Sequence, residues 1–222
     1  MFDDDDDDDI NLSAIKETPK YGNNKDYNKF KKEPKKDPTD VPNTPIVFFV
    51  DKSYPEEIKN KIFHYINKLM SKKINIRING DDKEFIEKVN ELKYSNLEIY
   101  IPFKGFNDIE SKLYFNDETS KLIAAKYMPT IDKLPPVVQS LLARNARLLF
   151  GNKNDSCAVA IITWSPDGAT KLLEIGKDTG RASHIIKMAV SNFISVLNLQ
   201  KPNCDIIFNK TFKLEEWQNG KT

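Results

Sequence analysis

The stretch GKDTGRASHIIKMAV, residues 176–190, joins a tight polar turn to an amphipathic helix. Apolar residues from Ala182 onward recur at three- and four-residue spacing, which is the pattern of one buried helical face. A helix N-terminus presents free backbone N–H groups and about half a positive charge. Gly180 lets the backbone approach a bound group closely, Thr179 can cap the helix, and Arg181 adds a bidentate cation. We therefore expect Thr179, Gly180, Arg181 and Ala182 to bind an anion, most simply a phosphate. The alternative is an ordinary capped helix with a solvent-facing arginine.

A second group of polar residues lies in the helical stretch LLARNARLLF, residues 141–150. Asn145 falls inside the apolar stripe of this helix, and a buried amide is costly unless it is hydrogen-bonded. We expect Asn145 to hold either a neighbouring loop or a ligand. Arg144 and Arg147 fall on the flank of the stripe, where Arg144 can neutralise a phosphate and where both can equally be surface residues.

Further polar residues follow the apolar runs that we interpret as strands. In parallel sheets, ligands bind outside the carboxyl ends of the strands. The candidates at these positions are Asn79, Gly80, Asp81, Ser165, Asp167 and Gly168. We expect Asn79, Asn145 and Asp167 to hydrogen-bond the base or sugar of a nucleotide-like ligand.

The chain lacks the sequence signatures of common catalytic and metal sites. HExxH, GxGxxG, GxxxxGK[ST] and a Ser-His-Asp elbow are all missing. We expect His184, in the first turn of the helix after residue 182, to face solvent, with a position in the ligand crevice as the alternative. The two cysteines have no CxxC spacing, which indicates no metal site and a reducing, cytoplasmic compartment. The acidic N-terminus leads us to expect no secretory signal, and no stretch approaches the ~20 apolar residues of a membrane span.

Strand and helix signals alternate between residues 45 and 210. We predict strands at 45–51, 74–80, 97–103, 157–164 and 194–199, with a sixth, edge strand at 204–210. We predict helices at 55–71, 81–92, 118–128, 136–150 and 182–194. Residues 104–117 are expected to form a loop with little fixed structure, and the strand at 157–164 to be central. This order predicts an α/β fold, a doubly wound, mostly parallel Rossmann-like sheet with helices on both faces.

Residues 1–44 differ in composition from the rest of the chain. Seven consecutive aspartates are followed by a lysine- and proline-rich block, which predicts a disordered tail before a single domain at 45–222. The tail is either merely solvated or an arm for nucleic acid or a protein partner. Only four of the 34 basic residues are arginine, so each arginine is expected to be needed for its planar fork.

The order of these motifs resembles the SLOG superfamily of Rossmann-like nucleotide-binding proteins, which includes DprA, the LOG-type phosphoribohydrolases and YpsA-like proteins. The resemblance covers residues 45–200 and rests on INIRINGDD, LEIYIPFKGFN, LLARNARLLFG, AVAIITWSPDGA and GKDTGRASHIIKMA. It implies the fold and a bound nucleotide, with no required cofactor, in a divergent phage-type member. The glycine-rich turn is reduced to Gly80, and the PGGxGT motif of the hydrolases is missing, so their activity is not implied.

Three functions follow from these observations. The first is binding of a nucleotide or other phosphate-bearing ligand, for sensing, sequestration or DprA-like handling of single-stranded DNA. The second is a divergent nucleotide or N-glycoside hydrolase, which needs a carboxylate such as Asp81, Asp167 or Glu174 to activate water. The third is an interaction or virion-associated role through the charged tail. The oligomeric state is left open by the sequence, and a homo-oligomer is one alternative.

Overall fold

The computed structural model describes residues 44–114, 117–152 and 156–214. The tail predicted at residues 1–44 lies outside these ranges except for Thr44. The strands are β1 (Ile46–Phe48), β2 (Ile76–Asn79), β3 (Leu97–Ile101), β4 (Leu113–Tyr114), β5 (Ala160–Thr163) and β6 (Ser195–Asn198). The helices are α1 (Glu56–Ser71), α2 (Lys83–Asn90), α3 (Glu118–Ala125), α4 (Pro136–Phe150), α5 (Ser183–Ser191) and α6 (Cys204–Thr211).

The six strands form one sheet in the order β4-β3-β2-β1-β5-β6, and every neighbouring pair is parallel. The chain winds outward from β1 to β4 and then returns to place β5 on the other side of β1. Since parallel crossovers are right-handed, this reversal places the two sets of helices on opposite faces. The predicted doubly wound α/β fold is therefore confirmed, with its switch point between β1 and β5.

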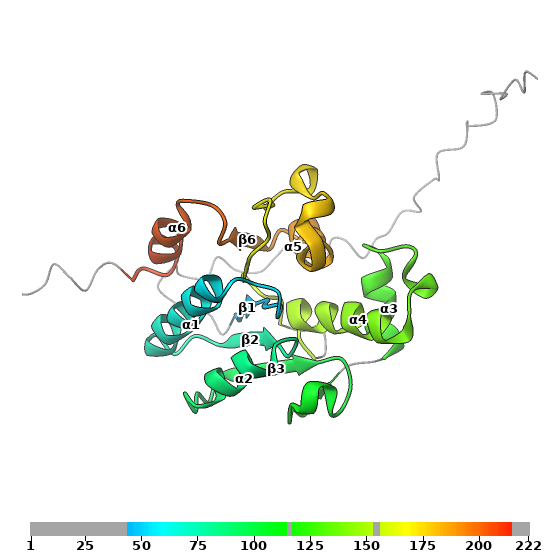
Figure 1. Ribbon diagram of the computed structural model, residues 1–222, viewed down its shortest axis with the longest axis horizontal. Helices are drawn as coiled ribbons and strands as arrows, with labels where there is room; N and C mark the ends of the chain where they lie inside the picture. Colours follow the sequence, from blue (N-terminus) through cyan, green and yellow to red (C-terminus); the bar gives the residue numbers. More distant parts are fainter. Residues whose placement is uncertain (1–43, 115–116, 153–155, 215–222) are drawn as a thin grey trace, which may run out of the picture. The chain divides into compact units, whose positions relative to one another are not determined.

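Helices cover both faces of the sheet (Figure 1). On one face, α4 contacts β2 and β3, and α5 contacts β5 and β6. On the other face lie α1 and α2, and α6 packs against α1 through Tyr65 and Phe208, whose rings stack at 3.7 Å. The strands read as continuous apolar runs because both of their faces are covered, and Val47 and Phe48 have no exposed surface. Within the described ranges, no helix is long and apolar enough to cross a bilayer.

Two of the expected elements were wrong. Residues 104–117, expected to be a loop, contain the short 3-10 helix η3 (Phe106–Asp108) and the edge strand β4. Residues 204–210, expected to be a strand, belong to helix α6. Cys204 and Phe208 are four residues apart and both buried, while Ile206 is 62% exposed, so the apolar residues follow a helical period.

The strand predicted at residues 157–164 was expected to be central, but in the structure it is β5, which does not lie in the middle of the sheet. β5 is flanked by β1 and β6, so it is an interior strand, but it lies one strand from the edge of the sheet. The middle of the sheet is formed by β1 and β2. Their carboxyl ends position the candidate site.

Candidate functional site

Asn79 joins the carboxyl ends of the two middle strands. Its side chain is fully buried, its Oδ1 accepts from Val50 N at 2.7 Å, and its Nδ2 donates to Val50 O at 2.6 Å. Both ends of the amide therefore bind the backbone that follows β1. The amide that we expected at a ligand instead fixes the spacing of the two strands.

A buried ion pair follows directly after β2. Asp81 accepts two hydrogen bonds from the guanidinium of Arg144 in α4, at 2.9 and 3.0 Å, and the Arg144 side chain is 1% exposed. Arg144 also donates to Tyr100 O at 3.3 Å and, through Nε, to Asn145 Oδ1 at 3.1 Å. The Arg144 charge is thus neutralised inside the protein.

Gly80 allows β2 to end close to its neighbours. A Cβ at Gly80 would lie 2.6 Å from Cγ2 of Ile101 and 3.1 Å from Cδ1 of Ile109. Such distances are shorter than carbon–carbon contact, so a larger residue would push the turn at residues 80–82 away from β3.

Arg181 reaches from the 3-10 helix η6 (Lys177–Ala182) to the turn after β1. Its Nη1 donates to Oδ2 of Asp51 at 3.0 Å, and Asp51 is buried while 65% of the Arg181 side chain is exposed. Burial alone would raise the pKa of Asp51, but hydrogen bonds from Ser53 and the guanidinium of Arg181 hold this pKa below its usual value. Asp51 is therefore an ionised anchor that aims an exposed guanidinium.

The loop after β5 forms a separate hydrogen-bonded network. Asp167 accepts from the hydroxyls of Ser165 and Thr179 and from Ala169 N. Although burial opposes ionisation, these hydroxyl donors lower the pKa of Asp167. Asn198 at the end of β6 donates to Ser165 Oγ at 2.7 Å. The network holds two loops together, and the polar side chains within it are largely paired with one another.

The helix predicted to begin at residue 182 begins at Ser183. Thr179 accepts from Gly176 N within η6, and α5 starts at Ser183 with Ala182 before it, where no side chain caps the helix. The prediction that Thr179 caps this helix is therefore wrong. Gly180, which lies between Thr179 and the start of α5, has φ of 59° and ψ of −137°, a conformation that essentially only glycine adopts.

Tyr54, in the loop after β1, contacts the residues at the carboxyl end of β5. It is 7% exposed, its hydroxyl is 2.9 Å from Oγ1 of Thr163, and its ring packs edge-on against Trp164. Burial raises the pKa of Tyr54, so the phenol stays neutral. In doubly wound folds the ligand usually lies at the switch point, here between β1 and β5. The Tyr54 side chain occupies that position, and the nearest cavity lies beside it.

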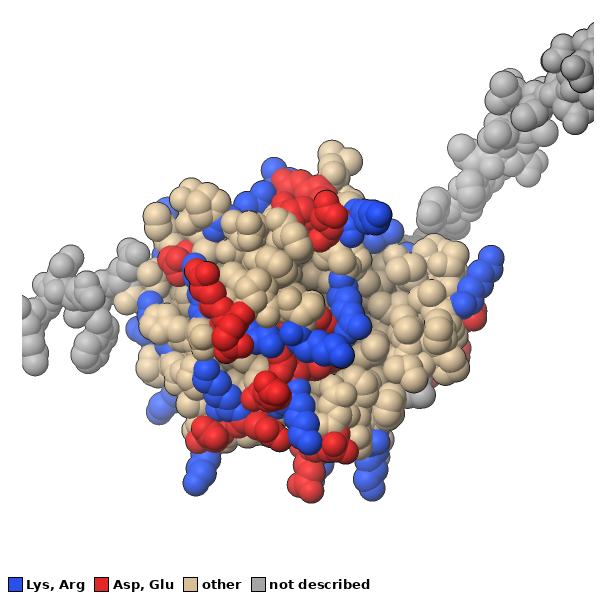
Figure 2. All heavy atoms as spheres, in the orientation of Figure 1, with Lys and Arg blue, Asp and Glu red and all other residues tan. Residues whose placement is uncertain are grey.

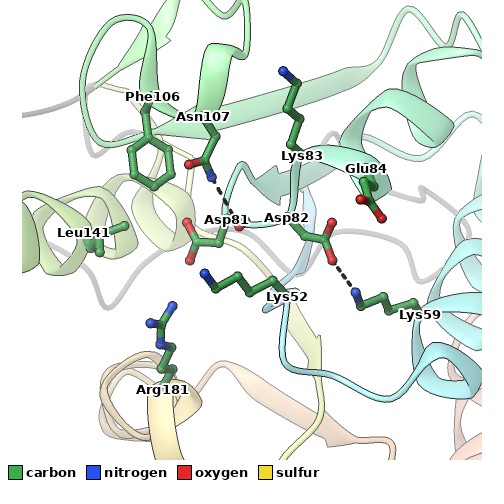
Figure 3. Close-up of a pocket in the computed structure, with 10 residues that line it drawn as sticks. All are labelled: Lys52, Lys59, Asp81, Asp82, Lys83, Glu84, Phe106, Asn107, Leu141 and Arg181. Carbon is green, nitrogen blue, oxygen red and sulfur yellow. Dashed lines mark hydrogen bonds and ion pairs between the residues drawn. The ribbon is translucent and has the colours of Figure 1, made fainter.

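That cavity has a volume of about 410 Å³ and lies at the carboxyl ends of β1, β2 and β3 (Figure 3). Its size is in the range of sites for one small molecule. Four cations line it, namely Lys52, Lys59, Lys83 and Arg181. Three carboxylates line it as well, namely Asp81, Asp82 and Glu84.

The lining charges are unequally satisfied. Lys59 forms a 2.6 Å ion pair with Asp82, which is also the N-cap of α2, and Asp81 is taken by Arg144. Within the described ranges, the ion-pair partner of Lys83 is the exposed Asp108, at 3.3 Å. Among the described residues, no carboxylate lies within ion-pair distance of Lys52.

Two of the cations converge beside the Asp81 carboxylate. Figure 3 shows the ammonium of Lys52 and the guanidinium of Arg181 pointing into the same space, beside Asp81. Phe106 and Leu141 form an apolar wall on one side, and Asn107 holds the loop above Asp81.

The predicted residues divide into three groups in this arrangement. Asp81 and Arg181 line the cavity. Asn79, Gly80, Arg144 and Asn145 lie behind its wall and hold that wall in place. Ser165, Asp167 and Thr179 belong to the hydrogen-bonded loop network, and Gly168 lies in the same loop. Gly180 and Ala182 belong to the segment that presents Arg181.

Sequence reasoning left out most of the cavity lining. Lys52 was recognisable as the residue after the first strand and its aspartate, but it was not singled out. Phe106 and Asn107 fall in the stretch that was expected to have little fixed structure. Leu141 was assigned to a buried helical stripe, and the structure places it at the cavity.

The expectation that His184 faces solvent was wrong, and the structure rules out the surface alternative for Arg147. His184 is 3% exposed, and its Nε2 lies 3.2 Å from Ala124 O in α3. Burial lowers the pKa of His184 to about 4. Arg147 is also buried, and it donates to Asp117 and Ser120 at the start of α3. Both residues fix α3, whose position no local pattern predicts.

No protein-family model matches this chain, and no curated protein matches it either.

Proposed function

We propose that this protein binds a phosphate-bearing small molecule in the cavity beside Lys52 and Arg181. The observation that supports this most is the convergence on one cavity of the Lys52 ammonium, which has no carboxylate partner in the described part of the chain, and the exposed, anchored guanidinium of Arg181. Two cations that face the same space attract an anion. A phosphate accepts hydrogen bonds from both, and arginine binds it through two parallel N–H groups.

The surrounding ion pairs support a binding role. Asp81 and Asp82 are taken up in ion pairs with Arg144 and Lys59, and the pKa of Asp51 is lowered. A general acid or base that works near neutral pH needs a pKa near neutrality. We therefore propose sensing or sequestration of the ligand, with hydrolysis as the outcome that a turnover assay would reveal.

We further propose that the chain is a divergent, phage-type member of the SLOG superfamily that acts in the cytoplasm. The sheet order and the cavity at the carboxyl strand ends support this assignment. Both cysteines are free thiols, as is usual in a reducing compartment.

A small ligand fits the surface better than a long single strand does. Figure 2 shows acidic and basic side chains interleaved across the face that it draws. Proteins that track single-stranded nucleic acid use a continuous cationic groove with aromatic side chains.

Lys52→Ala is the sharpest test, because Lys52 is exposed and has no carboxylate partner within the described residues. Calorimetric titration of the full chain with nucleotides, ribose 5-phosphate and short single-stranded DNA should reveal a phosphate ligand. Loss of a charged hydrogen bond should weaken its binding at least tenfold. Lys133→Ala, an exposed lysine of the 3-10 helix at Ile131–Lys133, is the matched control and should bind normally.

Equal binding by the Lys52 and Lys133 variants, or no binding of any phosphate compound to the wild type, would contradict the proposal. Product formation in the same mixtures would identify an enzyme. Binding of the DNA alone would transfer the function to nucleic acid.

A further inference from the structure

Two neighbouring helices end in a lysine-rich surface. Helices α1 and α6 lie side by side (Figure 1), and Nζ of Lys68 donates to Oδ1 of Asn209 at 3.3 Å. Among the described residues, Lys68, Lys72 and Leu214 line one hollow of about 420 Å³. The lysines that adjoin these residues in the chain belong to the same surface, which we call the lysine patch: Lys68, Lys72, Lys73, Lys210 and Lys213.

The charges of the lysine patch are not neutralised by carboxylates of the described chain. Among the residues that the structure describes, no carboxylate lies within ion-pair distance of these five ammonium groups. Residues 61–73 and 206–214 contain no aspartate or glutamate. Asp205, at the start of α6, forms its ion pair with Lys61 at 2.6 Å. The patch therefore attracts an anionic partner.

The outer face of α6 also carries exposed apolar side chains. Ile206 is 62% exposed and Ile207 is 48% exposed. Ile206 and Lys210 are four residues apart on the helix, so they lie on the same face. A helix dipole favours lysine in the last turn, as at Lys68 and Lys210, but it gives no reason for two exposed isoleucines. This face of the domain thus combines positive charge with apolar surface.

That combination fits an anionic lipid surface best. Clustered lysines are attracted to anionic headgroups, and apolar side chains beside them enter the boundary between headgroups and acyl chains. The phosphate backbone of a nucleic acid would use the lysines, but it offers no apolar partner to the isoleucines. The lysine patch shares no described residue with the ligand cavity, so a partner here is independent of the proposed ligand.

We propose that α6 and the lysine patch dock this protein on the surface of an anionic lipid bilayer. Ile206 and Ile207 enter the headgroup layer, and the five ammonium groups bind the charged headgroups around them. One lysine near such a surface strengthens binding only about fivefold, so attachment depends on the whole patch. Salt weakens the contact because it screens exposed charges.

Co-sedimentation of the full chain with lipid vesicles tests the proposal. Vesicles of phosphatidylcholine alone are compared with vesicles in which phosphatidylserine makes up roughly a quarter of the lipid. The wild type should bind the anionic vesicles at least about tenfold more tightly and should be released as the salt concentration rises. That preference should be lost in a variant that combines Lys72→Gln, Lys73→Gln, Lys210→Gln and Lys213→Gln.

A matched control removes the same charge from exposed lysines elsewhere and should bind like the wild type: Lys112→Gln, Lys133→Gln, Lys177→Gln and Lys187→Gln. Ile206→Ser combined with Ile207→Ser should weaken binding about tenfold or more, because the apolar contact is lost. Leu122→Ser combined with Val137→Ser is its control, since these residues of α3 and α4 are 60% and 51% exposed. Circular dichroism verifies the fold of each variant.

Equal binding of the wild type to the two kinds of vesicle would overturn the proposal. Equal losses in the two lysine variants would overturn it as well, since net charge would then drive the binding in place of the patch. An isoleucine variant that binds as tightly as the wild type would overturn the lipid assignment. Binding of a short DNA duplex by that variant would then identify nucleic acid as the partner.

Discussion

Replacing Asp81 with asparagine should be among the most destabilising single-atom changes in the site. Asp81→Asn keeps the shape of the side chain and removes the charge that faces Arg144. The Arg144 side chain is 1% exposed and that of Asp81 is 8% exposed, so water cannot replace the lost partner. Of the two carboxylate contacts at 2.9 and 3.0 Å, the amide can accept only one, and its N–H groups repel the guanidinium.

The magnitude follows from this burial. Removing one partner of a buried ion pair costs about 3–5 kcal/mol, mainly because the remaining charge is left uncompensated. Arg144 keeps its contacts to Tyr100 O and Asn145 Oδ1, so we expect the lower end, about 3 kcal/mol. With a urea dependence of about 2 kcal/mol per M, the unfolding midpoint should fall by roughly 1.5 M.

Equilibrium urea unfolding of the full chain, followed by circular dichroism, measures this shift. Asp108→Asn is the matched control, because Asp108 pairs with Lys83 at 3.3 Å and is 87% exposed, and exposed pairs contribute little. In an Arg144→Met background, Asp81→Asn should cost far less than in the wild type. Equal, small shifts for the two asparagine variants would refute the reasoning, as would full additivity with Arg144→Met.

Three further variants test the supports of the site. The pKa of about 4 at the buried His184 lies below the usual 6.5, so the unfolded chain takes up the proton first as pH falls. Stability should therefore be fully present above about pH 6.5 and fall by about 3 kcal/mol toward pH 4, as measured by urea unfolding at each pH. The variant His184→Gln should lose this contribution to the pH dependence, whereas His64→Gln, at an exposed position of α1, should retain it. Gly80→Ala should lower stability by about 1–3 kcal/mol through overlap with Ile101, and an unchanged thermal midpoint would contradict that crowding. Thr179→Val should cost about 1–2 kcal/mol, because Asp167 and Gly176 N lose a partner; thermal unfolding without a shift would show that the loop network does not depend on that hydroxyl.

Most of the fold was predictable because its elements have strong local patterns. The first three strands and the first two helices alternate with short loops, and α4 begins at Pro136 and ends at Phe150 as its apolar stripe predicts. The stretch 104–117 has no such period, and the conformation of η3 depends on hydrogen bonds from Asn107 to a turn 26 and 27 residues away. Helix α6 was misread because a short apolar run fits a strand and a helix equally well.

The sequence by itself predicted that polar side chains gather at the carboxyl ends of parallel strands and that the four arginines are needed for their planar fork. Tertiary structure decided which partners these arginines have. Every arginine forms an ion pair with a carboxylate, and the pairs of Arg144 with Asp81 and of Arg181 with Asp51 join residues 63 and 130 positions apart. Only the crossovers of the sheet bring such residues together. A charge is neutralised by the groups that lie within a few ångströms of it. Among the residues that the structure describes, the cavity cation without a carboxylate partner is therefore Lys52 and not Arg144.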